Sequence, residues 1–174
     1  MSKHQKLLET VEKYQALAAE NYDRIRKLAE EIDGGMCAYM NSQTGQCVHL
    51  VPPMGQFEPK PYGDQAFSMP PRGFRPLGPV AFGLAIRVTP GTDWLRVTLE
   101  CRKEGEDLMV QIAGGEEYRT QVPLADHDPE PLYELIYQHV FDWFGDRIDR
   151  YEDGDFGTRE IGFDFADEVE AVVA

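Results

Sequence analysis

The chain has 174 residues, with 31 acidic and 17 basic side chains, a formal net charge of −14 and a pI near 4.6. A surface this acidic repels phosphate backbones and anionic headgroups, so we expect no direct nucleic-acid binding and no membrane attachment. Hydrophobic residues make up 42% of the sequence and charged residues 28%, which is typical of a folded domain with an ordinary core.

The compartment is predicted from the apolar runs and the cysteines. The N-terminal residues contain no uninterrupted apolar stretch with the length of a signal-peptide core, and no stretch of the sequence approaches the length of a membrane span. The three cysteines are an odd number at modest density, which favours free thiols over a disulfide framework. These features predict a cytoplasmic protein with Cys37, Cys47 and Cys101 reduced.

Residues 2–32 predict one long helix, because apolar residues recur at alternating intervals of four and three. Gly34 and Gly35 are expected to end it. Such a helix is roughly 45 Å long, about as long as a domain of this size is wide. It therefore packs across its own domain, forms a homodimer, or binds an external helix. The seam consists of Leu7, Val11, Tyr14, Ala18, Asn21, Ile25, Leu28 and Ile32.

Two irregular segments follow. Residues 36–51 predict a hairpin, with Met36–Met40 and Gln46–Val51 as its strands. Residues 52–79 hold eight of the twelve prolines, with four aromatic residues between them. The prolines exclude a helix or a central strand, and the aromatic residues argue against a free linker. We expect a Pro-rich arm (52–79) that packs along the domain or covers a cleft.

Residues 80–124 predict an antiparallel meander. Four segments, Val80–Thr89, Trp94–Arg102, Leu108–Ala113 and Tyr118–Leu124, show the alternation of apolar side chains that a strand requires. Short turns, most of them containing glycine, separate these segments, and connections this short join antiparallel strands.

A second helix is predicted after Asp128 and Pro129, which suit its N-cap and first turn. Its apolar stripe runs from Leu132 to Tyr151 and is expected to pack on the apolar face of the meander. Residues 161–165 predict a further short strand. The fold class is therefore α+β: a long N-terminal helix, a meander of four to six strands and a C-terminal amphipathic helix packed on one face. We divide the chain into a helix at 1–33 and a single domain at 34–174 that contains the arm.

The acidic charge is concentrated in the last part of the chain. Residues 1–33 have a net charge of −1, residues 34–103 of +3 and residues 104–174 of −16. Such an acidic surface either keeps the protein soluble or attracts a basic partner. The leading hypothesis is a non-catalytic cytoplasmic interaction module whose second helix and tail bind a basic protein. Its predicted binding residues are Asp142, Asp146, Asp149, Glu152, Asp153 and Asp155.

The alternative hypothesis is a small-ligand sensor or enzyme with a pocket under the Pro-rich arm. Cys47 and His49, two apart on a strand, point to one side and can act together. Arg87, Arg96 and Arg119 share one predicted sheet face, where guanidinium groups bind carboxylates or phosphates.

Motifs of nucleotide binding, hydrolysis and redox catalysis are missing: there is no GxGxxG, P-loop, HExxH, GxSxG or CxxC. The spacing of Cys37, Cys47 and His49 matches no standard zinc pattern. We therefore expect no cofactor and no metal, and we lean away from an enzyme. His139, within the apolar stripe of the second helix, is expected to be a core histidine.

Overall fold

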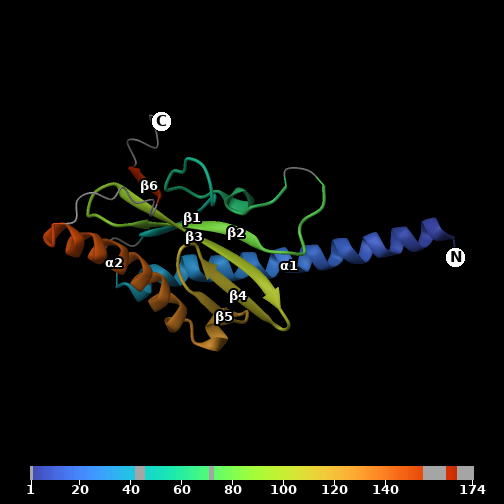
Figure 1. Cartoon of the computed structure of the whole chain (residues 1–174). Coiled ribbons are helices and arrows are strands. Elements are labelled where there is room, and N and C mark those ends of the chain that lie inside the picture. The colour runs from blue at the N-terminus through green and yellow to red at the C-terminus, as the bar shows by residue number, and fades with distance from the viewer. Residues whose placement is uncertain (1, 42–45, 71–72, 155–163, 168–174) are drawn as a thin grey trace.

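The computed structural model describes residues 2–41, 46–70 and 73–154, together with the backbone of 164–167. Its elements confirm the α+β class (Figure 1). The helices are α1 (Lys3–Tyr39) and α2 (Glu130–Glu152), with short 3-10 helices at Gly63–Ala66 and Leu124–His127. The strands are β1 (Val48–Val51), β2 (Val80–Arg87), β3 (Asp93–Glu104), β4 (Asp107–Ile112), β5 (Glu117–Thr120) and β6 (Asp164–Asp167).

The sheet confirms the predicted meander. Strands β1 to β5 lie in chain order, and every neighbouring pair is antiparallel. Strand β3 is the longest: β2 pairs along one edge, while β4 pairs with residues 99–104 and β6 with residues 93–96. The last strand therefore falls at Asp164–Asp167; residues 161–163 of the predicted strand lie outside the described residues.

Both helices pack on the same apolar face of the sheet. Alternate residues of β2 and β3, such as Leu84 and Val97, join residues of α1 and α2 in one continuous buried core. The period-2 pattern of the strands produces this face, because only one set of alternating side chains points toward the helices. The largest fully buried members of this core are Phe82, Ile25, Leu28, Ile32, Met36, Leu84, Leu95, Leu99, Leu108, Ile112 and Leu124.

Helix α1 is longer than predicted. It starts with a capping box in which Ser2 and Gln5 each satisfy the backbone N–H of the other, and it continues through Gly34 and Gly35 to Tyr39. The predicted strand Met36–Met40 is therefore wrong, because this segment continues the helix. Gly35 lies against the side chain of Tyr133 on α2, so the glycine permits close helix packing at a position where it was expected to end the helix.

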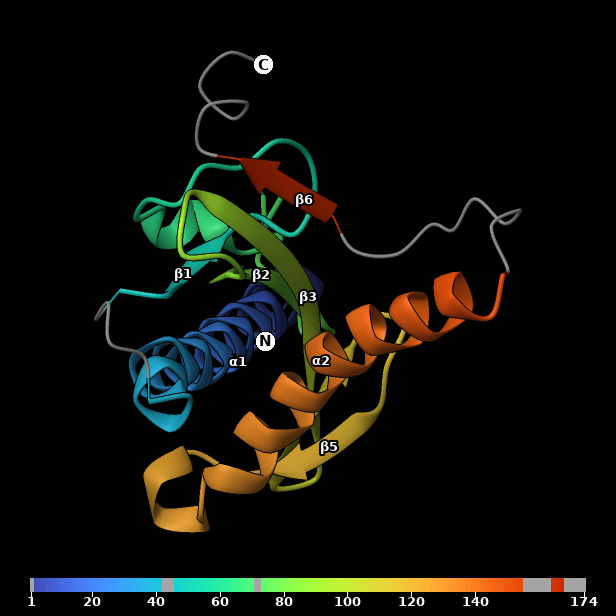
Figure 2. The ribbon, with the colours of Figure 1, turned by 90° about the vertical axis from the view of Figure 1, so that its left-hand side faces the viewer.

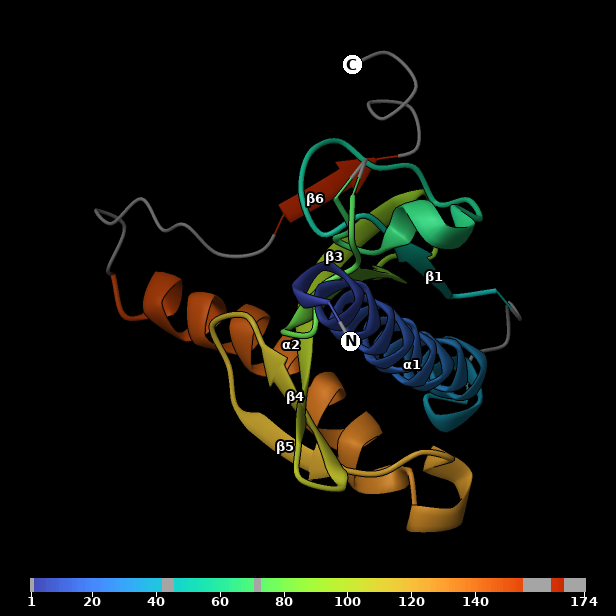
Figure 3. The ribbon, with the colours of Figure 1, turned by 90° about the vertical axis from the view of Figure 1, so that its right-hand side faces the viewer.

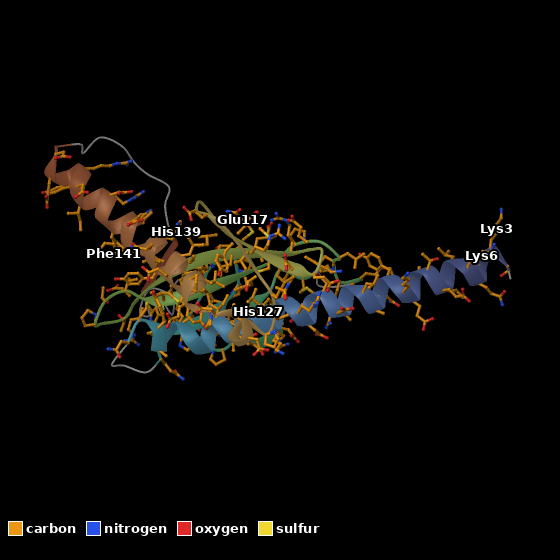
Figure 4. The ribbon with its side chains drawn as sticks, turned by 90° about the horizontal axis from the view of Figure 1, so that it is seen from below. Lys3, Lys6, Glu117, His127, His139 and Phe141 are labelled. Atoms are coloured by element: carbon orange, nitrogen blue, oxygen red, sulfur yellow. A yellow bond between two sulfur atoms is a disulfide. The ribbon has the colours of Figure 1, made fainter. Side chains whose placement is uncertain are left out.

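The two halves of α1 have different surroundings. Ala18, Ile25, Leu28 and Ile32 are buried in the core of their own chain, and the predicted seam therefore packs intramolecularly from Ala18 onward. The first turns project beyond the sheet, with Lys3 and Lys6 near the tip (Figures 1 and 4). Leu7 is more than half exposed, while Val11 and Tyr14 are partly buried. The homodimer through α1 remains a prediction. Of the predicted seam, only Leu7, Val11 and Tyr14 are open to a second chain.

The first part of the Pro-rich arm covers the other face of the sheet, while Ala66 and Phe67, further along the arm, join the main core beside α1. Phe57 of the arm joins Val51, Ala85 and Trp94 in a second, smaller buried cluster. The returning end of the arm is held by α1, where the Asn21 side-chain amide donates hydrogen bonds to the carbonyl oxygens of Pro76 and Gly78 at 3.2 and 3.1 Å. The arm is thus an integral part of the domain.

The prediction of three free thiols is wrong. Cys37 and Cys47 form a disulfide that ties the last turn of α1 to the start of β1. Because the helix continues to Tyr39, it carries Cys37 next to the residue that opens the following strand. Cys101 is a buried free cysteine, and burial strongly raises the pKa of its thiol. Among the described residues, neither helix combines the length and the apolar character needed to cross a membrane.

Candidate protein-binding site on helix α2

Helix α2 packs on the domain mainly through its first half, and in its second half Phe144 also packs against the core. Leu132, Tyr133 and Ile136 are buried, whereas Phe141, Ile148 and Tyr151 are 59%, 56% and 69% exposed. The second half of the helix projects away from the sheet (Figures 2 and 3). The prediction that the whole stripe to Tyr151 packs on the meander is therefore wrong for these last residues.

Four of the predicted acidic residues form a single stripe along α2. Asp142, Asp146, Asp149 and Asp153 follow one another at intervals of four, three and four, which places them on one side of a helix. All four are exposed, as is Glu152, which lies off this stripe. Asp155 lies outside the described residues.

The stripe borders an acidic groove between α2 and the turn that joins β4 to β5. The groove has a volume of about 610 Å³. Four carboxylates line it, from Glu116, Glu134, Asp142 and Asp146. Its apolar walls come from Ile112, Leu135 and Trp143. A negative rim around apolar walls suits a basic, partly apolar segment.

Three contacts shape the groove. The Arg147 guanidinium stacks 3.9 Å from the ring centroid of Trp143 and donates a hydrogen bond to that residue's carbonyl oxygen. His139 packs against Gly115, where a Cβ would lie 2.7 Å from its Nδ1. Burial lowers the pKa of His139, although the charge of Asp142 opposes this shift, so the imidazole stays neutral near pH 7 and leaves the groove negative. His139 is partly buried and lines the groove, so the prediction of a core histidine is right only in part.

An apolar groove runs along the other side of α2, and the sequence analysis missed it. Its volume is about 300 Å³, and its far wall comes from Met36, Met40, Ile86 and Val88. The residues of α2 on this side recur at intervals of four, three, four and three, a heptad pattern. We call these residues the α2 seam: Tyr137, Phe141, Phe144, Ile148 and Tyr151. Three of the five, Phe144, Ile148 and Tyr151, belong to the stripe that was predicted to pack on the meander.

Arg96, which was predicted to bind a ligand, is used by the fold. It is 5% exposed and donates hydrogen bonds to the carbonyl oxygens of Pro52 at 3.1 Å and Gly55 at 2.7 Å. Its guanidinium also lies 4.7 Å from the ring centroid of Phe57. Arg96 therefore holds the first part of the arm on the sheet.

Arg87 and Arg119 have separate partners. The Arg87 guanidinium lies 4.9 Å from the ring centroid of Trp94, on the strand paired with its own. Arg119 lies on the same face but on β5, at the far edge of the sheet, where it forms ion pairs with Glu104 and Asp107 at 2.9 and 2.8 Å. The three arginines are engaged in three different places, so the structure does not bring them together into one anion site.

A cavity does lie beneath the Pro-rich arm, as the alternative hypothesis expected. It has a volume of about 460 Å³ and lies between α1, β1 and the arm. His49 and Tyr62 line it, together with Asp33 and Cys37 of α1. Cys47 is sealed in the disulfide, so it offers no thiolate, and the Cys47–His49 nucleophile pair is excluded while the disulfide is intact.

Asp33 is the unusual group in this cavity. Its Oδ1 is shielded from solvent and has no hydrogen-bond partner within the described part of the chain. Burial, with a smaller contribution from the charge of Glu30, raises the pKa of its carboxyl to about 6. A shielded carboxyl oxygen of this kind can accept a hydrogen bond from a ligand.

Compared with known proteins, the chain matches no family model, no curated protein and no solved structure at a significant level. Within residues 2–41, 46–70 and 73–154, no group of three or more His, Cys, Asp and Glu side chains is arranged to hold a metal ion. The geometry of α2 and of the cavity under the arm is therefore the basis for a function.

Proposed function

We propose that the protein is a non-catalytic cytoplasmic interaction module that binds a basic protein segment along the projecting half of α2. One observation carries this proposal: Asp142, Asp146, Asp149 and Asp153 form an exposed acidic stripe beside a groove with apolar walls. The acids attract and orient a basic segment, and the walls of the groove bury its apolar parts.

The geometry limits what this segment can be. The groove lies between a helix and a turn, so it accepts one extended or helical segment rather than a flat protein surface. Because the acidic side chains are exposed, each ion pair contributes at most about 1 kcal/mol and weakens in salt. The expected partner therefore carries several Lys or Arg residues beside one or two apolar anchors.

The experiment measures the binding of a labelled helical peptide with four lysines and two leucines by fluorescence anisotropy. We expect the affinity to fall when salt is raised from 50 to 500 mM. A protein in which Asp142, Asp146 and Asp149 are replaced by Asn should bind about tenfold more weakly, because three exposed ion pairs are lost.

The matched control replaces Glu9, Glu12 and Glu20 by Gln. These three acids are exposed on α1, so the control changes the net charge by the same amount at a distant place. It should bind like the unchanged protein. Equal weakening in both variants, or binding that ignores salt, would contradict the proposal.

The cavity under the arm favours a second candidate, a small-ligand sensor. Its support is the shielded Oδ1 of Asp33 and the imidazole of His49 in one cavity. A ligand with an N–H donor complements the unpartnered oxygen. Small amines and amides, screened by calorimetry, should bind the unchanged protein and not an Asp33→Ala variant. Absence of binding in the whole set would contradict this candidate.

The cytoplasmic location is part of the proposal and is no longer supported by free thiols at Cys37 and Cys47, because these residues form a disulfide. Fractionation of cells that produce the full chain tests the location. Recovery with the soluble cytoplasmic fraction is the expected result, and recovery outside the cytoplasm would contradict it.

A further inference from the structure

We infer that the α2 seam is the dimer interface of this protein, and that the occupant of the apolar groove is α2 of a second copy running antiparallel to the first. The exposed apolar residues lie on one side of the projecting half of α2, beside a groove that α1 and β2 extend. This surface is distinct from the acidic stripe, so the inference does not depend on the proposed function.

The spacing of the seam matches a helix pair. Intervals of four, three, four and three keep side chains facing a second helix over four turns. The order of the residues is nearly symmetric about Phe144. In an antiparallel pair with its twofold axis at Phe144, each Tyr137 meets Tyr151 of the other copy. Each Phe141 then meets Ile148, and the two Phe144 rings meet each other, which is the self-complementary contact that a twofold dimer requires.

The charges fit this arrangement. At about 100° per residue, Asp142, Asp146, Asp149 and Asp153 lie more than a quarter turn around α2 from the seam. An antiparallel pair therefore keeps both acidic stripes on its outer surface and buries none of these carboxylates, so association avoids the cost of taking them out of water.

The exposed area of the seam is a large part of what a dimer needs. Tyr137 is 37% exposed, and Phe141, Ile148 and Tyr151 are more than half exposed. Large aromatic side chains bury 150–250 Å² each, so these four offer on the order of 400 Å² per chain and about 800 Å² per pair. The partly exposed side chains of Met40 and Val88 in the groove wall add to this sum. A standard interface buries about 1,200 Å² or more in total, so the seam supplies about two thirds of that area, which corresponds to a weak, reversible dimer.

The seam on α2 is better suited to a dimer than the predicted seam on α1. Most residues of the α1 seam are buried in their own chain, and Tyr14 contacts Phe74 of the arm with ring centroids 5.8 Å apart. The α2 residues at corresponding intervals lie at the surface. Figure 4 places Phe141 at the opposite end of the molecule from Lys3 and Lys6, so the two helices can be tested separately.

The first test is the solution mass of the full chain by light scattering and sedimentation equilibrium. We expect twice the chain mass of 19.8 kDa at micromolar concentration. A Phe141→Asp, Ile148→Asp variant should be monomeric with an unchanged circular dichroism spectrum, because both residues are exposed. The matched control, Leu7→Asp, Leu8→Asp, places two acids on the exposed part of α1 and should remain dimeric. A monomeric unchanged protein, or a monomeric α1 variant, overturns the inference.

The second test fixes the orientation. A Phe144→Cys variant, with its thiol on the predicted twofold axis, should form an intermolecular disulfide under mild oxidation. A Tyr151→Cys variant should not form one, because Tyr137 of the other copy lies opposite this position. No native thiol competes, since Cys101 is buried and Cys37 and Cys47 are paired. Efficient cross-linking at Tyr151 would show a parallel pair and overturn the inference.

Salt separates this inference from the proposed function. Screening reduces the repulsion between the two acidic copies, so the dimer should persist or strengthen as salt is raised. Binding of the lysine peptide should weaken over the same range. A dimer that dissociates at 500 mM salt contradicts the apolar interface and leaves the peptide result unaffected.

Discussion

The phenol of Tyr133 on α2 lies against the backbone of Gly35 on α1, at a place where any side chain would overlap it. The same hydroxyl donates a hydrogen bond to the carbonyl oxygen of Glu31, 3.2 Å away. A glycine near the C-terminal end of α1 therefore allows the two helices to approach closely.

Replacing Gly35 by Ala should destabilise the protein. Alanine in a helix is favoured over glycine by about 1 kcal/mol, but the new methyl group would displace the buried ring of Tyr133. We expect a net loss of about 1–3 kcal/mol in the free energy of unfolding, measured by urea denaturation.

The neighbouring glycine is the control for this prediction. Gly34 lies in the same helix, is exposed, and has no other heavy atom within 4 Å of where its Cβ would be. Gly34→Ala should therefore raise the free energy of unfolding by up to about 1 kcal/mol. The prediction fails if both substitutions change stability in the same direction.

Removing the disulfide should also destabilise the chain. Cys37 and Cys47 are 10 residues apart, and a link across a loop of this size restricts the unfolded chain by about 2–3 kcal/mol. A Cys37→Ala, Cys47→Ala variant should lose this amount. Complete reduction of the unchanged protein should bring it near the level of the variant. A Cys101→Ala variant should show the same drop on reduction as the unchanged protein; stability that ignores the reductant would contradict the prediction.

The carboxyl of Asp33 should make stability depend on pH. Its pKa is raised to about 6 in the folded chain, mainly by burial, and is near 4 when unfolded. Between about pH 4 and pH 6 the folded chain keeps a proton that the unfolded chain has lost, so the free energy of unfolding falls as pH rises. Above pH 6 the carboxyl is ionised in the folded chain as well. The full cost of shielding its charge from water then lowers the free energy of unfolding.

An Asp33→Asn variant removes the cost. It should be more stable than the unchanged protein at pH 7 by on the order of 1 kcal/mol, after allowance for partial solvent screening, and equally stable at pH 4. Urea denaturation at four pH values measures this difference. The control, Asp23→Asn, removes an exposed carboxyl from the same helix and should change stability at pH 7 by less than about 0.5 kcal/mol. A constant difference from pH 4 to pH 7 would contradict the assignment.

Arg96 should determine how firmly the arm is held. Replacing it by Met removes the two charge-assisted hydrogen bonds to the arm, at a cost of about 2–4 kcal/mol. We expect faster chymotrypsin cleavage after Phe57, which is buried while the arm is held on the sheet. Arg102→Met, which removes exposed ion pairs on the same sheet, should leave the cleavage rate unchanged.

The sheet could be predicted because its signal is local. In Val80–Arg87, side chains alternate between the two faces, so only one register places Phe82 and Leu84 in the core. The short turns then set the order of the strands. The end of α1 could not be predicted in this way. Gly34 and Gly35 are typical of a helix end, and the reason they remain helical is Tyr133, about a hundred residues further along the chain.

The candidate site was predicted in part. The interval pattern of Asp142, Asp146 and Asp149 is visible in the sequence, and it places them on one exposed side of α2. The register of the strands places the three arginines on one face, as predicted. That their side chains are engaged was not predictable, because the arm that occupies Arg96 approaches from a segment without periodic structure. The α2 seam was missed because the stripe of α2 includes both core residues and exposed ones, and periodicity alone does not show where a helix leaves the domain.

The pairing of β6 with the start of β3 matters while the chain is being synthesised. Residues 93–96 emerge from the ribosome about seventy residues before their partner, Asp164–Asp167. Until then the free edge of β3 offers unpaired backbone groups to any other extended chain. Proteolysis or premature termination ahead of Asp164 recreates this open edge permanently. The last strand, although only 4 residues long, therefore protects the sheet against aggregation.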